Sequence, residues 1–310
     1  MKGAGIKEIG GRVQLLDLPE PGDLKADELL IDVRAAGVAN WDDIVRTGGW
    51  DVGIKPPMAM GVEASGVVRA VGSAVKRFRP GDEVMTHSLP LRHQGAWAQQ
   101  FVAPEGMVAA KPSGMSWEVA GVFPVPALTA GQVLRQVVAV QPGEFVLVHG
   151  GGGVTGGVIV AVATALGARV IATAGSRSAE RVRAYGASVV LDYRNENWKE
   201  EVRQLTGAGG VPVAVNAVRS AAATVIPLVA DGGRLATITG DPPDSQRGIT
   251  VSNCYVSPDG EALDKLAADF AARHLTIPIA TLYGLSEAGA ALAAAAAGQT
   301  AGGVVIDPSR

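Results

Sequence analysis

A glycine-rich turn joins an apolar run to a second apolar run in the middle of the chain. Residues 145–149 are mostly apolar and lead into four consecutive glycines, 150–153, and Gly156 follows shortly after. Gly151, Gly153 and Gly156 match the G-x-G-x-x-G spacing. A strand that ends in such a turn brings bare backbone close to a pyrophosphate, and the next helix points free N–H groups and its positive dipole end at the anion. The turn therefore predicts a dinucleotide-binding site.

The residues after the turn complete a strand–helix–strand unit. Residues 158–166 are typical of a buried helix that ends at Gly167, and residues 169–174 are typical of a second strand. The spacing alone is weak evidence in a chain with 41 glycines, because a glycine-rich loop can be purely structural. This context favours the binding site. We expect cofactor contacts from Gly151, Gly152, Gly153, Val154 and Thr155.

The end of the second predicted strand indicates which dinucleotide is bound. Sites that prefer NAD usually carry an acidic residue there, which binds the ribose hydroxyls. Here Ala174 holds the place, and Ser176 and Arg177 supply a hydroxyl donor and a fixed cation for a 2′-phosphate. We therefore predict NADPH as the cofactor. The alternative is that Arg177 is only a solvated charge at the start of a helix.

Composition excludes several other classes of protein. The 310 residues are enough for two domains, and 47% of them are hydrophobic, yet Gly, Pro or charged residues interrupt each apolar run before it could span a membrane. The formal net charge of −3 disfavours nucleic acid as a partner. Cys254 is the single cysteine, which fits a reducing cytoplasm. We expect a cytoplasmic protein with no membrane or nucleic-acid partner.

The chain divides into two kinds of pattern. Up to about Pro112, short β-like runs separated by Gly and Pro predict an irregular β-rich domain. Beyond the glycine turn, strand-like and helix-like segments alternate, which predicts a doubly wound parallel sheet. Residues 277–310 contain an alanine-rich helical segment and a last strand, and we expect them to return to the first domain. The predicted fold class is thus α/β.

Several motifs together resemble the medium-chain dehydrogenase/reductase superfamily, in its zinc-independent quinone oxidoreductase and enone reductase branch. The resemblance covers nearly the whole chain. It rests on residues 36–42, 61–68, 80–84, 95–98 and 128–130, on the glycine turn, and on residues 192–193, 232–235 and 302–305. It implies a GroES-like catalytic domain over residues 1–117 and 277–310 and a Rossmann NADPH-binding domain over 118–276.

The chain departs from the zinc-dependent alcohol dehydrogenases at two positions. Where those relatives have a Cys and a His as zinc ligands, this chain has Ala39 and Val62. A catalytic zinc needs three ligands from Cys, His or carboxylate side chains. We therefore expect no metal and a conjugated substrate, because hydride addition to an enone, enal, quinone or enoyl thioester needs only hydrogen-bond donors near the carbonyl oxygen.

The resemblance also implies roles for individual residues. Asn40, one position after the usual branch asparagine, is a candidate to orient substrate, and Tyr255 is a candidate proton donor; the alternatives are a helix cap for Asn40 and solvent as the donor. Trp41 and Trp50 are candidate walls of the substrate pocket, although Trp41 suits the core equally well. Further cofactor contacts are implied for Thr129, for Tyr193 at the end of a predicted strand over residues 188–193, for Thr239, and for Cys254 and Val256 in a strand over residues 253–256. Helix capping is the alternative for Thr129, and a buried inert thiol is the alternative for Cys254.

These predictions lead to one main functional hypothesis and three alternatives. The main hypothesis is an NADPH-dependent reductase of quinones or activated C=C bonds that acts on a small-molecule substrate, as a homodimer. The alternatives are an enoyl reductase for carrier-bound or coenzyme A thioesters, a catalytically silent NADPH-binding structural or regulatory protein, and, least favoured, a zinc alcohol dehydrogenase.

Overall fold

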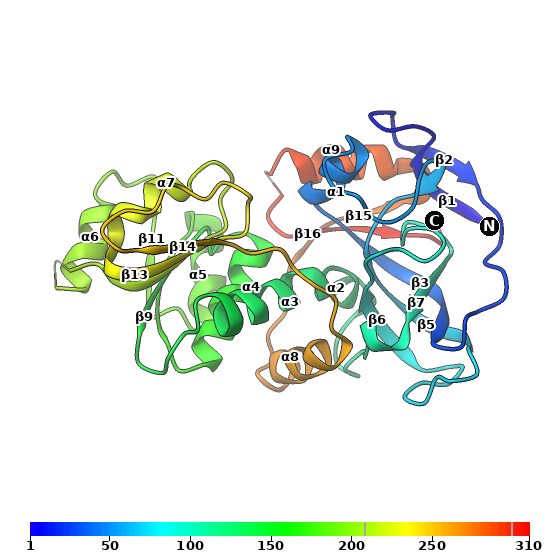
Figure 1. Cartoon of the computed structure of the whole chain (residues 1–310), viewed down its shortest axis with the longest axis horizontal. Coiled ribbons are helices and arrows are strands. Elements are labelled where there is room, and N and C mark those ends of the chain that lie inside the picture. The colour runs from blue at the N-terminus through cyan, green and yellow to red at the C-terminus, as the bar shows by residue number, and fades with distance from the viewer. Residues whose placement is uncertain (208, 299) are drawn as a thin grey trace. The chain divides into compact units, whose positions relative to one another are not determined.

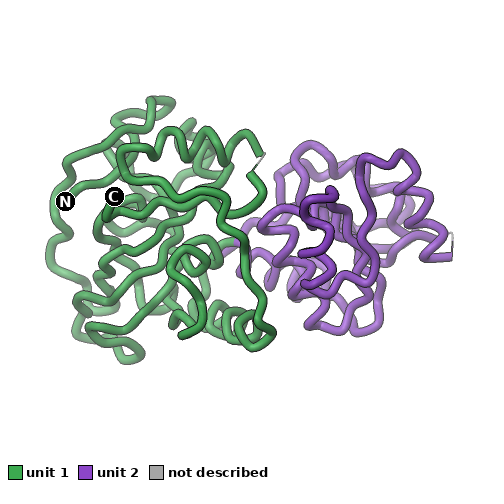
Figure 2. The backbone as a smooth tube through the Cα atoms, turned by 180° about the vertical axis from the view of Figure 1, so that it is seen from behind, with its two compact units in different colours: residues 1–125, 258–310 green, residues 126–257 purple. Residues whose placement is uncertain are grey.

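The computed structural model describes residues 1–207, 209–298 and 300–310. The chain packs into two compact units, coloured separately in Figure 2. Unit 1 comprises Met1–Val125 and Pro258–Arg310, and unit 2 comprises Pro126–Ser257. The expected domain boundaries lay at residues 117 and 277. By packing, the helices α2 (Trp117–Val122) and α8 (Gly260–Ala272) belong to unit 1.

Unit 2 is built on a parallel sheet (Figure 1). Its strands in chain order are β9 (Phe145–His149), β10 (Arg169–Thr173), β11 (Val189–Leu191), β12 (Val211–Asn216), β13 (Val229–Thr237) and β14 (Thr250–Asn253). They lie side by side in the order β11-β10-β9-β12-β13-β14, and each adjacent pair is parallel. This is the 3-2-1-4-5-6 order of the Rossmann fold, so the predicted α/β class is confirmed.

Helices follow four of the strands of unit 2. They are α4 (Val154–Ala165), α5 (Ser176–Ala184), α6 (Trp198–Leu205) and α7 (Ala222–Val225), with a 3₁₀ turn, η3, at Ile226–Leu228. In this topology the strand order reverses between β9 and β12, and ligands bind beyond the carboxyl ends of strands at such a switch point. The glycine turn lies directly at the carboxyl end of β9.

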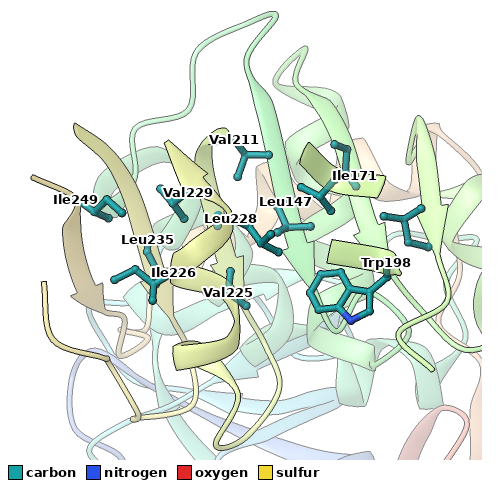
Figure 3. Close-up of a cluster of buried hydrophobic side chains, with 13 residues drawn as sticks. Leu147, Ile171, Trp198, Val211, Val225, Ile226, Leu228, Val229, Leu235 and Ile249 are labelled. Carbon is teal, nitrogen blue, oxygen red and sulfur yellow. The ribbon is translucent and has the colours of Figure 1, made fainter. Parts of the chain in front are cut away.

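One face of this sheet packs into a buried hydrophobic cluster (Figure 3). Leu147 of β9, Ile171 of β10 and Leu235 of β13 contribute from the sheet, and Trp198 of α6 lies beside them. The strands β9 to β12 are mainly apolar and rich in branched residues, as expected when both faces of a parallel sheet are covered. This packing holds the strand ends, and with them the glycine turn, in fixed positions.

Unit 1 contains two sheets. The larger is ordered β15-β16-β3-β5-β6-β8, with β7 also paired to β3, and the smaller is ordered β2-β1-β4. The strands are β1 (Lys2–Ile6), β2 (Gln14–Asp17), β3 (Glu28–Val38), β4 (Met58–Ala59), β5 (Glu63–Val71), β6 (Glu83–His87), β7 (Gln100–Pro104), β8 (Val108–Ala110), β15 (Ile279–Gly284) and β16 (Gly303–Asp307). The predicted β-rich first part is confirmed. The last strand, β16, pairs with β3.

The remaining helices are short or moderately long. They are α1 (Asn40–Arg46), α3 (Pro124–Gln132), α9 (Ala288–Ala296), the π-helical segment η2 (Val133–Val137) and the 3₁₀ turns η1 (Glu105–Met107) and η4 (Leu285–Glu287). Local capping explains where several begin; the carboxylate of Asp259, for example, accepts a hydrogen bond from Ala262 N at 2.9 Å to start α8. Within the described residues, no helix is long and apolar enough to cross a membrane.

Candidate dinucleotide-binding site

The glycine turn has the backbone geometry that the sequence predicts. Gly150 adopts φ = 93°, and Gly153 is the extended N-cap of α4. The N–H of Gly153 donates to the carbonyl oxygen of Gly150 at 3.1 Å, which closes the turn. The N–H groups in the first turn of α4 have no partner inside the helix, so they are free to meet an anion. The turn therefore suits a pyrophosphate.

The glycines are required by close packing at particular positions. A Cβ atom on Gly156 would overlap the carbonyl oxygen of Gly150, and one on Gly152 would lie 2.5 Å from Ser178 Oγ. For a Cβ on Gly153, the nearest atom of the described residues would be Gly150 O at 3.6 Å. Gly156 thus lets α4 pack tightly against the turn, while Gly152 allows the turn to approach α5.

The end of β10 presents small and basic residues. Ala174 is buried, Gly175 is the N-cap of α5, and Ser176 and Arg177 in its first turn are exposed. Ser178 connects this segment to the glycine turn, since its hydroxyl donates to Gly175 O at 3.1 Å and lies against Gly152. The segment that predicts NADPH is therefore adjacent to the predicted pyrophosphate site.

Arg194 joins this segment and was missed by the sequence analysis. Its guanidinium lies over Gly175, where a Cβ atom would come within 2.9 Å of Nη1. The guanidinium also lies 5.0 Å from the centre of the Tyr193 ring, and the backbone N–H of Arg194 donates to Asp192 Oδ1 at 3.0 Å. The only sequence signal for Arg194 was its position beside Tyr193.

Tyr193 lies beyond its strand, not at the strand end as the sequence predicted. β11 ends at Leu191, and Tyr193 occupies the following turn with 48% of its surface exposed. The apolar run stops contributing to the sheet where Asp192 begins a turn stabilised by its own carboxylate. Tyr193 and Arg194 thus project from a turn next to the start of α5.

A polar network lies at the ends of β12 and β13. Asn216 Nδ2 donates to the hydroxyl oxygens of Thr237 and Thr239, both at 3.2 Å. Both threonine hydroxyls donate to Asp241 Oδ1, from Thr237 at 2.7 Å. The candidate Thr239 is therefore held in one orientation at the carboxyl edge of the sheet.

The candidates after β14 follow the strand instead of forming part of it. The strand ends at Asn253, so Cys254, Tyr255 and Val256 occupy the segment after it. Cys254 is buried, and burial raises the pKa of its thiol, which favours the unreactive reading. Tyr255 has 79% of its surface exposed. Its ring is free to contact a bound molecule.

Of the remaining candidates, Thr129, Asn40 and Trp41 lie on helices, and Trp50 lies beyond the end of α1. Thr129 is buried within α3, so the alternative reading of Thr129 as a helix cap is wrong. Ala39 is the N-cap of α1 and Asn40 is the first helical residue, so the cap reading of Asn40 is wrong too. Trp41 and Trp50 are half-buried.

The buried titratable side chains of unit 1 include Asp42 in α1, Glu63 in β5 and His87 in β6. Asp42 Oδ2 accepts a hydrogen bond from Ala39 N at 2.8 Å, and Glu63 Oε2 accepts one from Val125 N at 2.8 Å. Burial raises the pKa of Asp42 to about 7 and that of Glu63 to about 8. His87 ends β6 with Nδ1 3.1 Å from Val62 O, and burial lowers its pKa to about 4. These three groups are structural parts of the unit 1 interior.

The residues do not fit a zinc ion. In the described part of the chain, no group of three or more His, Cys, Asp or Glu side chains is placed to hold a metal. Ala39 and Val62 occupy the positions where the zinc-dependent relatives carry ligands, and an alkyl side chain cannot coordinate. No step of the chemistry proposed below passes through a metal.

Comparison with known proteins agrees with this geometry. The family model for the alcohol dehydrogenase GroES-like domain matches residues 25–113, and the model for zinc-binding dehydrogenase matches residues 154–257. The chain is 29% identical to the quinone oxidoreductase of Sus scrofa over 223 residues, which covers 71% of this chain and 66% of that protein. The structure of mycobacterial Rv1454c complexed with NADPH is 31% identical, with a TM-score of 0.85 and coverage of 99% and 100% of the two chains. The chain belongs to the medium-chain dehydrogenase/reductase superfamily, in its quinone oxidoreductase branch.

A further relative is a much larger protein. The chain is 36% identical over 205 residues to erythronolide synthase EryA2 of Saccharopolyspora erythraea, which covers 65% of this chain and 5% of the synthase. The chain thus spans about one twentieth of that synthase and just under two thirds of the porcine quinone oxidoreductase.

Proposed function

We propose that this member of the superfamily is an NADPH-dependent oxidoreductase that reduces a quinone or an activated C=C bond without zinc. The observation that carries the proposal is the pair of arginines, Arg177 and Arg194, beside Ser176 at the end of a parallel sheet with a bare glycine turn. Two cations and a hydroxyl donor match the charge of a 2′-phosphate. The NADPH complex of the mycobacterial structure supports the choice of cofactor.

Bound NADPH would supply a hydride to the substrate. The chain's own residues bind the cofactor and the substrate and orient them toward each other. In this proposal the backbone from Gly151 to Thr155 holds the pyrophosphate, and Ser176, Arg177, Tyr193 and Arg194 hold the adenosine end. Thr129, Thr239, Cys254 and Val256 are the proposed contacts for the rest of the cofactor.

Fewer residues are proposed to act on the substrate than on the cofactor. Trp41 and Trp50 provide flat apolar surface for a conjugated substrate, and Asn40 donates a hydrogen bond that orients it. Tyr255 supplies the proton that follows hydride addition, and its high exposure allows the proton to be replaced from solvent. Hydride transfer of this kind depends on positioning more than on acid–base strength.

A substrate panel tests the reaction. NADPH oxidation is followed by absorbance with quinones, enones and acyl thioesters as substrates. We expect turnover with at least one class, and an absence of turnover with all of them would overturn the proposed reaction. Turnover confined to acyl thioesters would establish an enoyl thioester reductase instead. Tight NADPH binding without turnover would establish the silent regulatory protein.

Cofactor preference gives a sharper test of the two arginines. In Arg177→Gln and Arg194→Gln we expect KM for NADPH to rise about tenfold and KM for NADH to stay unchanged, because a charge-assisted hydrogen bond to the 2′-phosphate contributes about 1.5 kcal/mol or more. Arg183→Gln is the matched control, since Arg183 is exposed near the other end of α5. An unchanged KM for NADPH in both variants would remove this phosphate site from the proposal.

We also propose that the protein is a homodimer. β14 is the terminal strand of the unit 2 sheet, and its outer edge has no strand partner within the described residues. An open edge of this kind suits pairing with a second copy of the same strand. Sedimentation equilibrium would measure the state directly.

A further inference from the structure

The last residue of β10 contacts the glycine turn through a short chain of hydrogen bonds. The N–H of Gly150 donates to Thr173 Oγ1 at 2.9 Å, and Thr173 Oγ1 lies 2.9 Å from His149 Nδ1. The threonine hydroxyl can accept from Gly150 and still donate its own hydrogen, and it donates to His149 when Nδ1 carries no hydrogen. Thr173 therefore connects β10 to the first peptide of the turn. Both side chains are buried, with 1% of Thr173 and 7% of His149 exposed.

His149 is buried and neutral, so its Nδ1 is able to accept this hydrogen bond. Its ring stacks on Trp198 with 5.2 Å between ring centres and 7° between ring planes. Burial, with a smaller contribution from the charge of Lys199, lowers the pKa of His149 to about 4, so the ring is neutral at neutral pH. A neutral Nδ1 without hydrogen accepts the threonine hydroxyl, and the hydrogen of the ring then resides on Nε2. Trp198 belongs to the buried cluster of Figure 3, which fixes the ring in place.

Thr173 binds the N–H of Gly150, a residue that contacts both the rest of the glycine turn and the start of α4. The carbonyl oxygen of Gly150 accepts the N–H of Gly153, and it lies where a Cβ on Gly156 would be. The N–H side of Gly150 is thus fixed by Thr173, and the carbonyl side meets both the N-cap and the first turn of α4. Rotation of this residue would move the N–H groups that face the anion.

We infer that Thr173, oriented by His149, is a positioning residue for the dinucleotide pyrophosphate. It acts by keeping the glycine turn in its binding-competent conformation, and it does not itself contact the cofactor. This inference rests on the proposed function only in requiring that a nicotinamide dinucleotide binds at this turn. Because NADH and NADPH share the pyrophosphate, the effect is the same for both.

The test compares Thr173→Val with Thr173→Ser. Valine keeps the shape of threonine but removes the hydroxyl, and serine keeps the hydroxyl. The dissociation constants of NADPH and NADH are measured by the change in cofactor fluorescence, and kcat is measured separately. We expect Thr173→Val to raise both dissociation constants about tenfold, as follows if the competent fraction of turns falls to about one tenth. Thr173→Ser should restore them to within about twofold, and kcat should be unchanged in both variants.

Thr164→Val is the matched control. Thr164 lies in α4, and its buried hydroxyl oxygen has no hydrogen-bond partner among the described residues. The same chemical change there should leave both dissociation constants unchanged. Equal cofactor binding by Thr173→Val and the wild type would overturn the inference, as would a loss that serine does not restore. Weakened NADPH binding alone would assign the effect to the phosphate site, and a wild type that binds neither cofactor would overturn the proposed function as well.

Discussion

At the residue scale, the buried carboxyl group of Asp42 provides a pH-dependent stability. Only 1% of Asp42 is exposed, and its Oδ1 has no hydrogen-bond partner in the part of the chain that the structure describes. Burial raises its pKa from 3.8 to about 7. Between these two values the unfolded chain has lost the proton while the folded chain retains it, so stability is complete below about pH 4 and falls as pH rises toward 7.

The variant Asp42→Asn tests this residue because an amide carries no charge at any of these pH values. We expect wild type and variant to have similar free energies of unfolding below about pH 4. The variant should be more stable above pH 7, by an amount on the order of a few kcal/mol, because each pKa unit corresponds to about 1.4 kcal/mol. Urea unfolding across this range measures the difference. A difference that does not change with pH would show that Asp42 does not titrate in this way.

At the element scale, the junction between the glycine turn and α4 depends on one glycine. In Gly156→Ala, the new methyl group overlaps the carbonyl oxygen of Gly150, and the helix has to move away from the turn. We expect a loss of about 1–3 kcal/mol in unfolding free energy, which is typical of overpacking, together with weaker NADPH binding. Gly153→Ala is the control for stability, because its methyl group meets nothing closer than 3.6 Å at a backbone φ of −77°. Equal thermal midpoints for the two variants would contradict this account.

The same junction shows what sequence could predict and what it could not. The turn, the strands around it and the α/β class followed from apolar runs and glycine spacing, because these patterns are local. Thr173 and Arg194 were missed, since each acts on a glycine 19 or more residues away and only the folded sheet brings the pairs together. Tyr193 was assigned to a strand because the apolar run continues to Leu191, and nothing local marked where pairing with β10 stops.

At the scale of the whole molecule, the chain retains the architecture of a family that includes zinc-binding dehydrogenases, while the ligand positions are filled by Ala39 and Val62. Structural resemblance at this scale therefore does not predict metal use. Whether a metal binds depends on a few ligand side chains, whereas the fold depends on the order of the strands and on the buried residues of each unit.

This separation leads to a prediction about metal removal. We expect dialysis against a strong chelator to leave both NADPH oxidation and the thermal midpoint unchanged, because no group of side chains in the described chain is placed to hold a metal. Elemental analysis of the protein before dialysis should find zinc well below one ion per chain. A zinc-dependent alcohol dehydrogenase treated in parallel provides the positive control. Loss of activity that added zinc restores would show that the chain assembles a metal site from other side chains, and the zinc-independent reaction would then have to be abandoned.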